Sequence, residues 1–249
     1  MLVLGSDYDI KSAVAWFAKA AQKGYAPAQV NLAVLHVNGW GVAPDYGVAL
    51  SWLHEAAEQH YAAAYFNLGE LYFRGAGVKQ DYAEAFRYFQ LGADGGDTYA
   101  QTNLGYLYDR GLGVKPDIGL AVRWYRKAAN AGNPLAQCNL ADLYSKGEGV
   151  PKDEAEAFRL YQAAAQKGHT GAEIQLAYRL ALGVGAPRDQ KSALAWVTAA
   201  SAAGDNRGQE LLRSLRSQLS PAEVKRATES AAQLRAAAEV AGKSAMLQP

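Results

Sequence analysis

Apolar and small residues recur along this chain in a pattern that returns every 36 residues. In each period, a first segment carries apolar residues three or four positions apart, as in Ala64, Leu68 and Leu71. A second segment does the same, as in Ala49 and Leu53, and such spacing places the residues on one face of an amphipathic helix. A Gly-x-Gly pair separates the two segments and begins at positions 39, 75, 111, 147 and 183. The pattern predicts five consecutive helix pairs.

The residues around each Gly-x-Gly pair predict where the helices end and begin. Glycine enters the left-handed conformation without strain, so the first glycine is expected to cap the first helix. An aspartate follows six residues later, and its carboxylate can accept the unpaired N–H groups at the start of the second helix. The five aspartates are Asp45, Asp81, Asp117, Asp153 and Asp189.

Two further sets of positions keep the same period. A small residue at Ala33, Gly69, Gly105, Ala141 and Ala177 would let the paired helix approach closely. A bulky residue at Trp16, Trp52, Tyr88, Trp124, Leu160 and Trp196 would fill the space between successive pairs, and we interpret it as core rather than as a ligand site. The expected fold is all-α, a right-handed α/α solenoid held together by contacts between neighbouring pairs.

The repeat also predicts how the chain is divided. Residues 1–27 are expected to form an N-terminal capping helix equivalent to half a repeat, and residues 28–204 form five repeats. Residues 205–240 are expected to form two C-terminal capping helices, the second with a thin apolar stripe of Val224, Ala227, Ala231 and Leu234. Residues 241–249, with Gly242, are predicted to be a disordered tail.

The repeat in segment 100–132 carries a nearly complete family pattern. Its residues are Ala100, Leu104, Gly105, Tyr108, Gly111, Val114, Asp117, Ala121, Trp124, Tyr125, Ala128 and Gly132. This pattern resembles the Sel1-like repeat family, a relative of the tetratricopeptide repeats. The resemblance implies a helical solenoid that binds other proteins. The residues that it fixes are structural, so they do not specify the partner.

Composition narrows the classes of function. The chain has 249 residues, of which 50% are hydrophobic and 20% charged, with a formal net charge of +1. This balance argues against a general nucleic-acid or anionic-membrane binder, and no apolar run is long enough for a membrane span. The first five residues are too short for a signal-peptide core. The cytoplasm is therefore the default location, and a periplasmic or secreted location stays open if a leader has been removed.

No catalytic motif is found. His36, His54, His60 and His169 occupy different repeat positions, so no two are expected to share a metal, and the single Cys138 excludes a cysteine-based zinc site. The glycine pairs follow helices and lack the Gly-Lys-[Ser/Thr] of phosphate loops. We expect no catalytic residue, cofactor or metal, and Cys138 is expected to be a buried small hydrophobe.

Residues that vary within the constant frame are the candidates for binding. By resemblance to tetratricopeptide proteins, the residue before the core leucine points into a concave groove formed by the first helices. Amides at this position could pair with the backbone of an extended peptide, or they could bond only to the neighbouring repeat. They form an asparagine ladder: Asn31, Asn67, Asn103 and Asn139, followed by Gln175.

The last residue of each first helix forms a second ladder, with Arg74, Arg110 and Lys146 as its cations. These cations could hold acidic groups, or they could simply favour the helix dipole. The N-terminal part of the groove is more apolar, with Val34, Val37 and Phe66 among its residues. The predicted partner-binding set is Asn31, Asn67, Asn103, Asn139, Phe66, Glu70, Arg74, Tyr106, Asp109, Arg110, Asp142 and Lys146.

The sequence therefore predicts a non-enzymatic scaffold that binds a protein or peptide partner in this groove. The expected setting is bacterial signalling, envelope regulation or host interaction, and the chain is expected to be a monomer. The alternative is a hydrolase acting on a cell-wall or β-lactam-like ligand, and a deep pocket with convergent titratable groups would favour it. An RNA-binding helical repeat is a third hypothesis, which the near-zero net charge disfavours.

Overall fold

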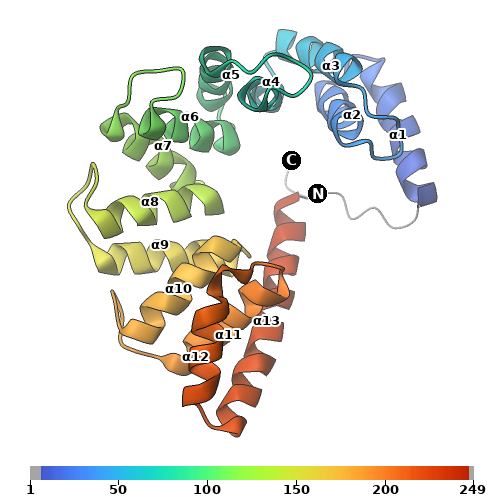
Figure 1. The fold of residues 1–249 in the computed structure, drawn as a ribbon. Coiled ribbons are helices and arrows are strands. Elements are labelled where there is room, and N and C mark those ends of the chain that lie inside the picture. Colours follow the sequence, from blue (N-terminus) through green and yellow to red (C-terminus); the bar gives the residue numbers. More distant parts are fainter. Residues whose placement is uncertain (1–6, 247–249) are drawn as a thin grey trace. The chain divides into compact units, whose positions relative to one another are not determined.

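The computed structural model describes the backbone of residues 7–246 and the side chains of residues 10–240 (Figure 1). The described residues form helices and no strand. The chain divides into two compact units, residues 1–124 and 125–249. The first unit contains α1 (Asp7–Ala21), α2 (Ala26–Asn38), α3 (Tyr46–Glu58), α4 (Ala62–Arg74), α5 (Tyr82–Asp94) and α6 (Thr98–Arg110), and α7 (Ile118–Asn130) runs across the boundary. The second unit contains α8 (Pro134–Lys146), α9 (Glu154–Gln166), α10 (Thr170–Leu182), α11 (Gln190–Ala202), the short 3-10 helix η1 (Asn206–Gly208), α12 (Gln209–Gln218) and α13 (Pro221–Met246).

Helices pack on their sequence neighbours within each unit. In the first unit, α2 packs on α3, α3 on α4, α4 on α5 and α5 on α6, and the first helices α2, α4 and α6 also touch in succession. In the second unit, α8, α9, α10 and α11 pack in the same order. Contacts that run mainly within a helix pair and between successive pairs define an α-helical repeat solenoid, so the predicted fold class is confirmed.

The helix boundaries follow the predicted signals. Gly111 ends α6 with φ +67°, and its N–H donates to the carbonyl of Leu107. Asp81 caps α5 by accepting the N–H groups of Ala83 and Glu84 at 2.9 and 3.1 Å. The second glycine of each pair is required for a different reason. A Cβ on Gly113 would lie 2.6 Å from the backbone nitrogen of Ala83, at the start of α5. This glycine therefore lets one loop rest directly on the preceding helix pair.

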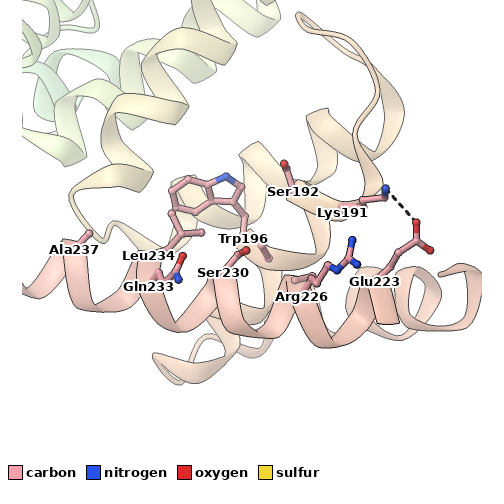
Figure 2. A pocket seen from close by; sticks show the side chains of 11 residues that line it. Lys191, Ser192, Trp196, Glu223, Arg226, Ser230, Gln233, Leu234 and Ala237 are labelled. Atoms are coloured by element: carbon pink, nitrogen blue, oxygen red, sulfur yellow. Dashed lines mark ion pairs between the residues drawn. The ribbon is translucent and has the colours of Figure 1, made fainter. Parts of the chain in front are cut away.

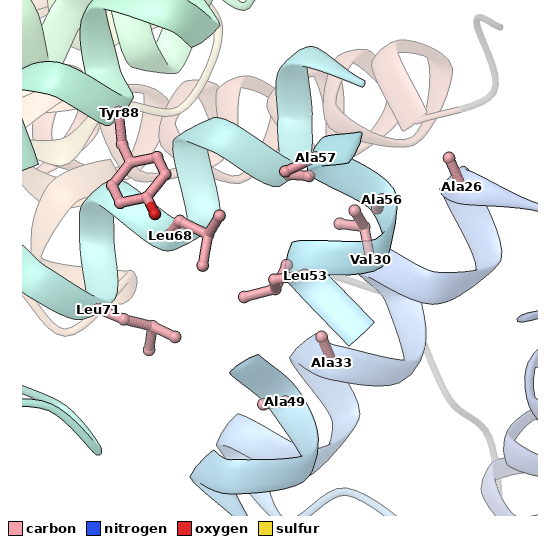
Figure 3. Close-up of a cluster of buried hydrophobic side chains, with 11 residues drawn as sticks. Ala26, Val30, Ala33, Ala49, Leu53, Ala56, Ala57, Leu68, Leu71 and Tyr88 are labelled. Atoms are coloured by element: carbon pink, nitrogen blue, oxygen red, sulfur yellow. The ribbon is translucent and has the colours of Figure 1, made fainter. Parts of the chain in front are cut away.

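The core alternates between leucines and small residues. Val30, Ala33, Leu53, Leu68 and Leu71 lie in one cluster of the first unit together with Tyr88 (Figure 3). The small residue at position 69 allows the paired helix to approach closely, as predicted, because a Cβ on Gly69 would lie 2.6 Å from the ring of Phe89. The bulky positions Tyr88, Leu160 and Trp196 are buried.

Trp16 does not fit the predicted core. Its side chain is 72% exposed, and Lys19 lies over the ring at 5.4 Å from the centroid. The corresponding positions of later repeats pack between two helix pairs. Because α1 is the first described helix, no earlier pair in the described part of the chain covers Trp16.

The C-terminal helices differ from a regular repeat. The helix α13 packs along α11 and also touches α9, with Ala227, Ala231 and Ala238 buried. It continues to Met246, so the predicted disordered tail at 241–249 is wrong for 241–246. A single glycine such as Gly242 costs an alanine-rich helix only about 1 kcal/mol and does not have to end it.

Residues 1–6 and 247–249 lie outside the described residues. Among the described helices, none combines the length and the apolar character needed to cross a membrane.

Candidate functional site

A groove of about 370 Å³ lies between α2, α3 and α4 in the first unit, and we call it the α2–α4 groove. Four residues of the predicted partner-binding set line it, all of them from α4. They are Phe66, Asn67, Glu70 and Arg74. Residues three and four positions apart share one face of a helix, which explains why they converge. The groove is completed by Val34, Val37, Asn38, Tyr46, Leu53, Leu71 and Ala76.

Aromatic packing fixes the apolar wall of the groove. The ring of Phe66 is half-buried, with its centroid 6.2 Å from that of Phe89 and 5.6 Å from that of Tyr99. Val34 and Val37, on the opposite helix α2, are also half-buried. An apolar side chain entering this groove would therefore meet a preformed surface.

The polar wall is held by an ion pair and a hydrogen bond. Glu70 pairs with Arg74 one turn later on α4 at 2.5 Å. Asn103 Nδ2, on α6, donates to Glu70 Oε1 at 2.6 Å. Asn67 Nδ2 donates to the carbonyl of Ala63 at 2.8 Å. Asn103 thus bonds to the neighbouring repeat, which is the structural alternative for the asparagine ladder, while Asn67 faces the groove.

The other predicted residues of the first unit lie outside the lining of this groove. Asn31 is exposed on α2. On α6, the guanidinium of Arg110 lies over the ring of Tyr106 at 5.7 Å and 3.5 Å from the carboxylate of Asp109. These three residues form a small cluster of their own.

The predicted residues of the second unit lie on α8. Asn139 is half-buried there, and Lys146 lies 3.9 Å from Glu148. Asp142 accepts a hydrogen bond from the hydroxyl of Tyr161 on α9. Burial, together with this hydrogen bond, raises the pKa of Tyr161. Asp142 therefore supports the buried tyrosine.

Comparison of repeat positions shows an arginine that the sequence analysis missed. Leu35, Leu71, Leu107 and Leu143 are buried in successive first helices, and the equivalent residue of α10 is Arg179. Arg179 is only 9% exposed and lies over the ring of Tyr161 at 4.4 Å. It donates to Ser145 Oγ at 2.5 Å and lies 3.5 Å from Glu154. A polar network thus replaces an apolar contact in the second unit.

A second missed residue is a buried glutamate. Gln29, Gln101 and Gln137 each donate a side-chain N–H to the backbone carbonyl eight residues earlier, at 3.4, 3.2 and 3.2 Å. Glu173 occupies the same repeat position with 1% exposure, and an ionised carboxylate has no proton to donate. Its nearest cation is Arg235 of α13 at 3.5 Å. Burial raises the pKa of Glu173 to about 6 despite this pairing.

Cys138 is buried, and we predict that it is unreactive in the folded protein. Burial, and secondly the charge of Asp142, raise the pKa of the Cys138 thiol to about 12, and only the thiolate attacks alkylating reagents. At pH 8, iodoacetamide should modify the folded chain at least about a hundredfold more slowly than the urea-unfolded chain, as followed by intact mass. Equal rates would contradict this prediction.

Within the described residues, no group of three or more His, Cys, Asp or Glu side chains is arranged to hold a metal ion.

The geometry defines the class of protein, an α-solenoid built from helix pairs of 36 residues. The model of the Sel1 repeat family matches residues 4–25, 26–61, 62–97, 98–133, 134–169 and 170–205. The chain belongs to the Sel1 repeat family. The period is the one predicted, each full repeat begins two residues earlier than expected, and residues 4–25 count as a further, partial repeat.

Solved structures support this assignment. The chain is 36% identical to a Sel1 repeat protein from Oxalobacter formigenes, over 78% of this chain and 79% of that chain, with a TM-score of 0.72. It is 27% identical to c5321, a protective antigen present in uropathogenic Escherichia coli strains, over 96% of this chain and 60% of that chain, with a TM-score of 0.58. A sel1 repeat protein from Klebsiella pneumoniae shares the fold at 20% identity, over 82% of this chain and 99% of that chain, with a TM-score of 0.55. No curated protein gave a significant match.

Sel1 repeat proteins generally mediate protein–protein interactions, and the family is typically a non-enzymatic scaffold. The residues that match the family pattern here are the ones that cap helices and fill the core. The α2–α4 groove combines core residues that recur with the repeat, such as Leu71, with residues that vary between repeats, such as Phe66.

Proposed function

We propose that the chain is a non-enzymatic interaction scaffold that binds a peptide, or an extended segment of a partner protein, in the α2–α4 groove. The observation that carries this proposal is the groove itself. In it, four residues proposed for binding meet an apolar wall in a space of about 370 Å³. This volume suits one or two anchoring side chains of a peptide.

Each part of the groove has a role in this proposal. Phe66, Val34 and Val37 take an apolar side chain of the partner, which supplies most of the affinity. Asn67 uses one side-chain N–H for the carbonyl of Ala63, so its second N–H and its Oδ1 can pair with a peptide backbone. The Glu70–Arg74 pair at the rim favours polar residues beside the anchor.

The proposed setting is a bacterial signalling, envelope-regulatory or host-interaction complex. The similarity to c5321, which is described as a protective antigen of uropathogenic strains, supports a place for such scaffolds in host interaction. In this setting, the chain binds one segment of a partner and holds it on a rigid helical frame.

The test uses peptides selected from a random library against the purified chain, so the natural partner does not have to be identified first. For a selected peptide, Phe66→Ala should weaken the affinity measured by calorimetry at least about tenfold, because truncating a central aromatic anchor has an effect of that size. Asn67→Ala should weaken it about threefold, the value of one neutral hydrogen bond.

Two matched variants serve as controls. Tyr25→Ala removes an exposed aromatic ring and Asn130→Ala removes an exposed amide, both away from the groove lining. Neither should change the affinity. The proposal fails if no selected peptide distinguishes Phe66→Ala from Tyr25→Ala, or if circular dichroism shows that Phe66→Ala is unfolded while Asn67→Ala, folded, binds like the wild type.

A further inference from the structure

A second cavity, of about 570 Å³, lies between α11 and α13 in the second unit (Figure 2). It is lined by Lys191, Ser192 and Trp196 of α11 and by Glu223, Arg226 and Leu234 of α13, with several alanines, Ser230 and Gln233 completing the walls. Figure 2 shows Arg226 between the two helices, with Trp196 and Leu234 further along the cavity. None of these residues belongs to the α2–α4 groove.

The cavity exists because α13 packs along α11, where a regular repeat would place the first helix of the next pair. Trp196 holds the repeat position of Trp52 and Tyr88, which pack against a continuous apolar cluster in the first unit. At Trp196 the partner is α13, whose cavity-facing residues include the small Ala227 and Ser230. Small side chains opposite an indole leave space that a regular repeat fills, so one side of Trp196 borders a cavity.

The charges in this cavity leave one cation without a counter-ion. Lys191 and Glu223 pair at 3.2 Å. Glu223 also accepts the hydroxyl of Ser220 at 2.8 Å and the N–H of Ser220 at 3.0 Å. The hydrogen bonds from Ser220, and secondly the contact with Lys191, lower the pKa of Glu223 to about 2. Its carboxylate therefore stays ionised and keeps these contacts. Arg226 is exposed and forms no ion pair within the described residues. The cavity therefore carries one net positive charge.

We propose that this cavity binds a small aromatic monocarboxylate, with the ring at the apolar end lined by Trp196 and Leu234 and the carboxylate on Arg226. A guanidinium donates two parallel hydrogen bonds to a carboxylate, and an indole favours an offset-stacked aromatic ring. A second negative charge on the ligand would meet Glu223, so the cavity selects a monoanion. A volume of about 570 Å³ lies within the range of small-ligand sites.

The experiment compares three compounds of one shape and different charge: 3-phenylpropanoate, 3-phenylpropanamide and 3-phenylpropylamine. Binding to the full chain is followed by nuclear magnetic resonance at the indole N–H of Trp196, which the spectrum of Trp196→Phe assigns. The carboxylate should bind saturably with a Kd of about 1 mM, as expected for a ligand of this size. The amide should bind about tenfold more weakly, and the amine more weakly still.

Two arginine variants decide the role of the guanidinium. Arg226→Gln should lower the affinity for 3-phenylpropanoate about tenfold, to that of the amide, and leave the affinity for the amide unchanged. Arg216→Gln removes an exposed arginine of α12 with the same loss of charge and should change neither affinity. Trp196→Leu, which introduces the residue type found at the equivalent position 160, should weaken both compounds.

Three results would overturn the proposal. They are equal affinities for the three compounds, an equal effect of Arg216→Gln and Arg226→Gln, and the absence of a saturable shift at Trp196 in the wild type. Each of them would leave the peptide proposal for the α2–α4 groove intact, because that test uses other ligands and other residues.

Discussion

A Gly113→Ala variant is expected to lose about 3–4 kcal/mol of stability in the first unit, whereas Gly96→Ala loses about 1–2 kcal/mol. Both glycines have a positive φ, +67° for Gly113 and +91° for Gly96, so both substitutions strain the backbone. They differ in their surroundings. A Cβ on Gly113 would overlap the backbone of Tyr82 and Ala83, and a Cβ on Gly96 would have nothing within 4 Å. The difference between the variants therefore isolates the contact between the loop and the preceding helix pair.

Urea unfolding followed by circular dichroism measures this difference. The two variants carry the same chemical change, so Gly96→Ala is a matched control for the cost of the positive φ. Losses of equal size would show that the second glycine is required only for its backbone conformation and that the close approach to α5 contributes nothing.

A Glu173→Gln variant is expected to be more stable than the wild type at neutral pH, by about 1–2 kcal/mol. Glutamine at the equivalent positions 29, 101 and 137 donates to the carbonyl eight residues earlier, so the amide introduced by the substitution would regain that bond with the carbonyl of Ala165. The substitution also removes a buried charge that Arg235 compensates only in part, because the pKa of Glu173 stays above its ordinary value.

The sign of the pH dependence follows from this raised pKa. Glu173 has a pKa of about 6 in the folded chain against an ordinary value of 4.5, so it favours folding when protonated. This stabilisation is complete below about pH 4.5 and is lost as the pH rises through about 6. The advantage of Glu173→Gln over the wild type should therefore be large at pH 7.5 and small at pH 4.5.

Arg235→Met provides the matching half of a double-mutant cycle. In the wild type it should destabilise the second unit by about 2 kcal/mol at pH 7.5, because it leaves the carboxylate of Glu173 buried without a cation. In the Glu173→Gln background it should cost less than about 0.5 kcal/mol. Urea midpoints of the four chains at pH 7.5 and 4.5 measure these values. A pH dependence that survives in Glu173→Gln would assign it to another group.

Most of the fold could be predicted because most helix boundaries have a local cause. A glycine with a positive φ ends the first helix and an aspartate caps the second, and both depend on residues within one turn of the boundary. A glycine alone did not predict a helix end correctly at Gly242. No second helix-ending signal accompanies this glycine, and α13 continues to Met246.

Less of the candidate site could be predicted from the sequence. Phe66, Asn67, Glu70 and Arg74 come together because they share one face of α4, which helical periodicity predicts. The walls supplied by Tyr46 and Leu53 depend on how α3 packs, and periodicity does not provide that packing. Arg179 stands at a repeat position that is leucine in the four preceding first helices. A comparison of equivalent positions would therefore have found it in the sequence.

The pairing of Glu173 with Arg235 could not be predicted from the repeat. The two residues are 62 positions apart, and they meet only because α13 lies along α11 instead of taking the place of a regular second helix. The cavity beside Trp196 has the same origin. Departures from the repeat thus concentrate where the periodic pattern no longer determines the packing.

The seating of each loop on the preceding pair has a consequence for how such a chain can change in length over evolution. Gly77 packs on the start of α3 as Gly113 packs on the start of α5, so excising residues 62–97 would bring the loop of Gly113 to the equivalent surface at the start of α3. The end of the chain has no such freedom, because Glu173 in the last matched repeat takes its counter-ion from α13. A gene of this kind can gain or lose copies from its interior, while the Glu173–Arg235 pair is kept only if the segment 170–246 is inherited as one block.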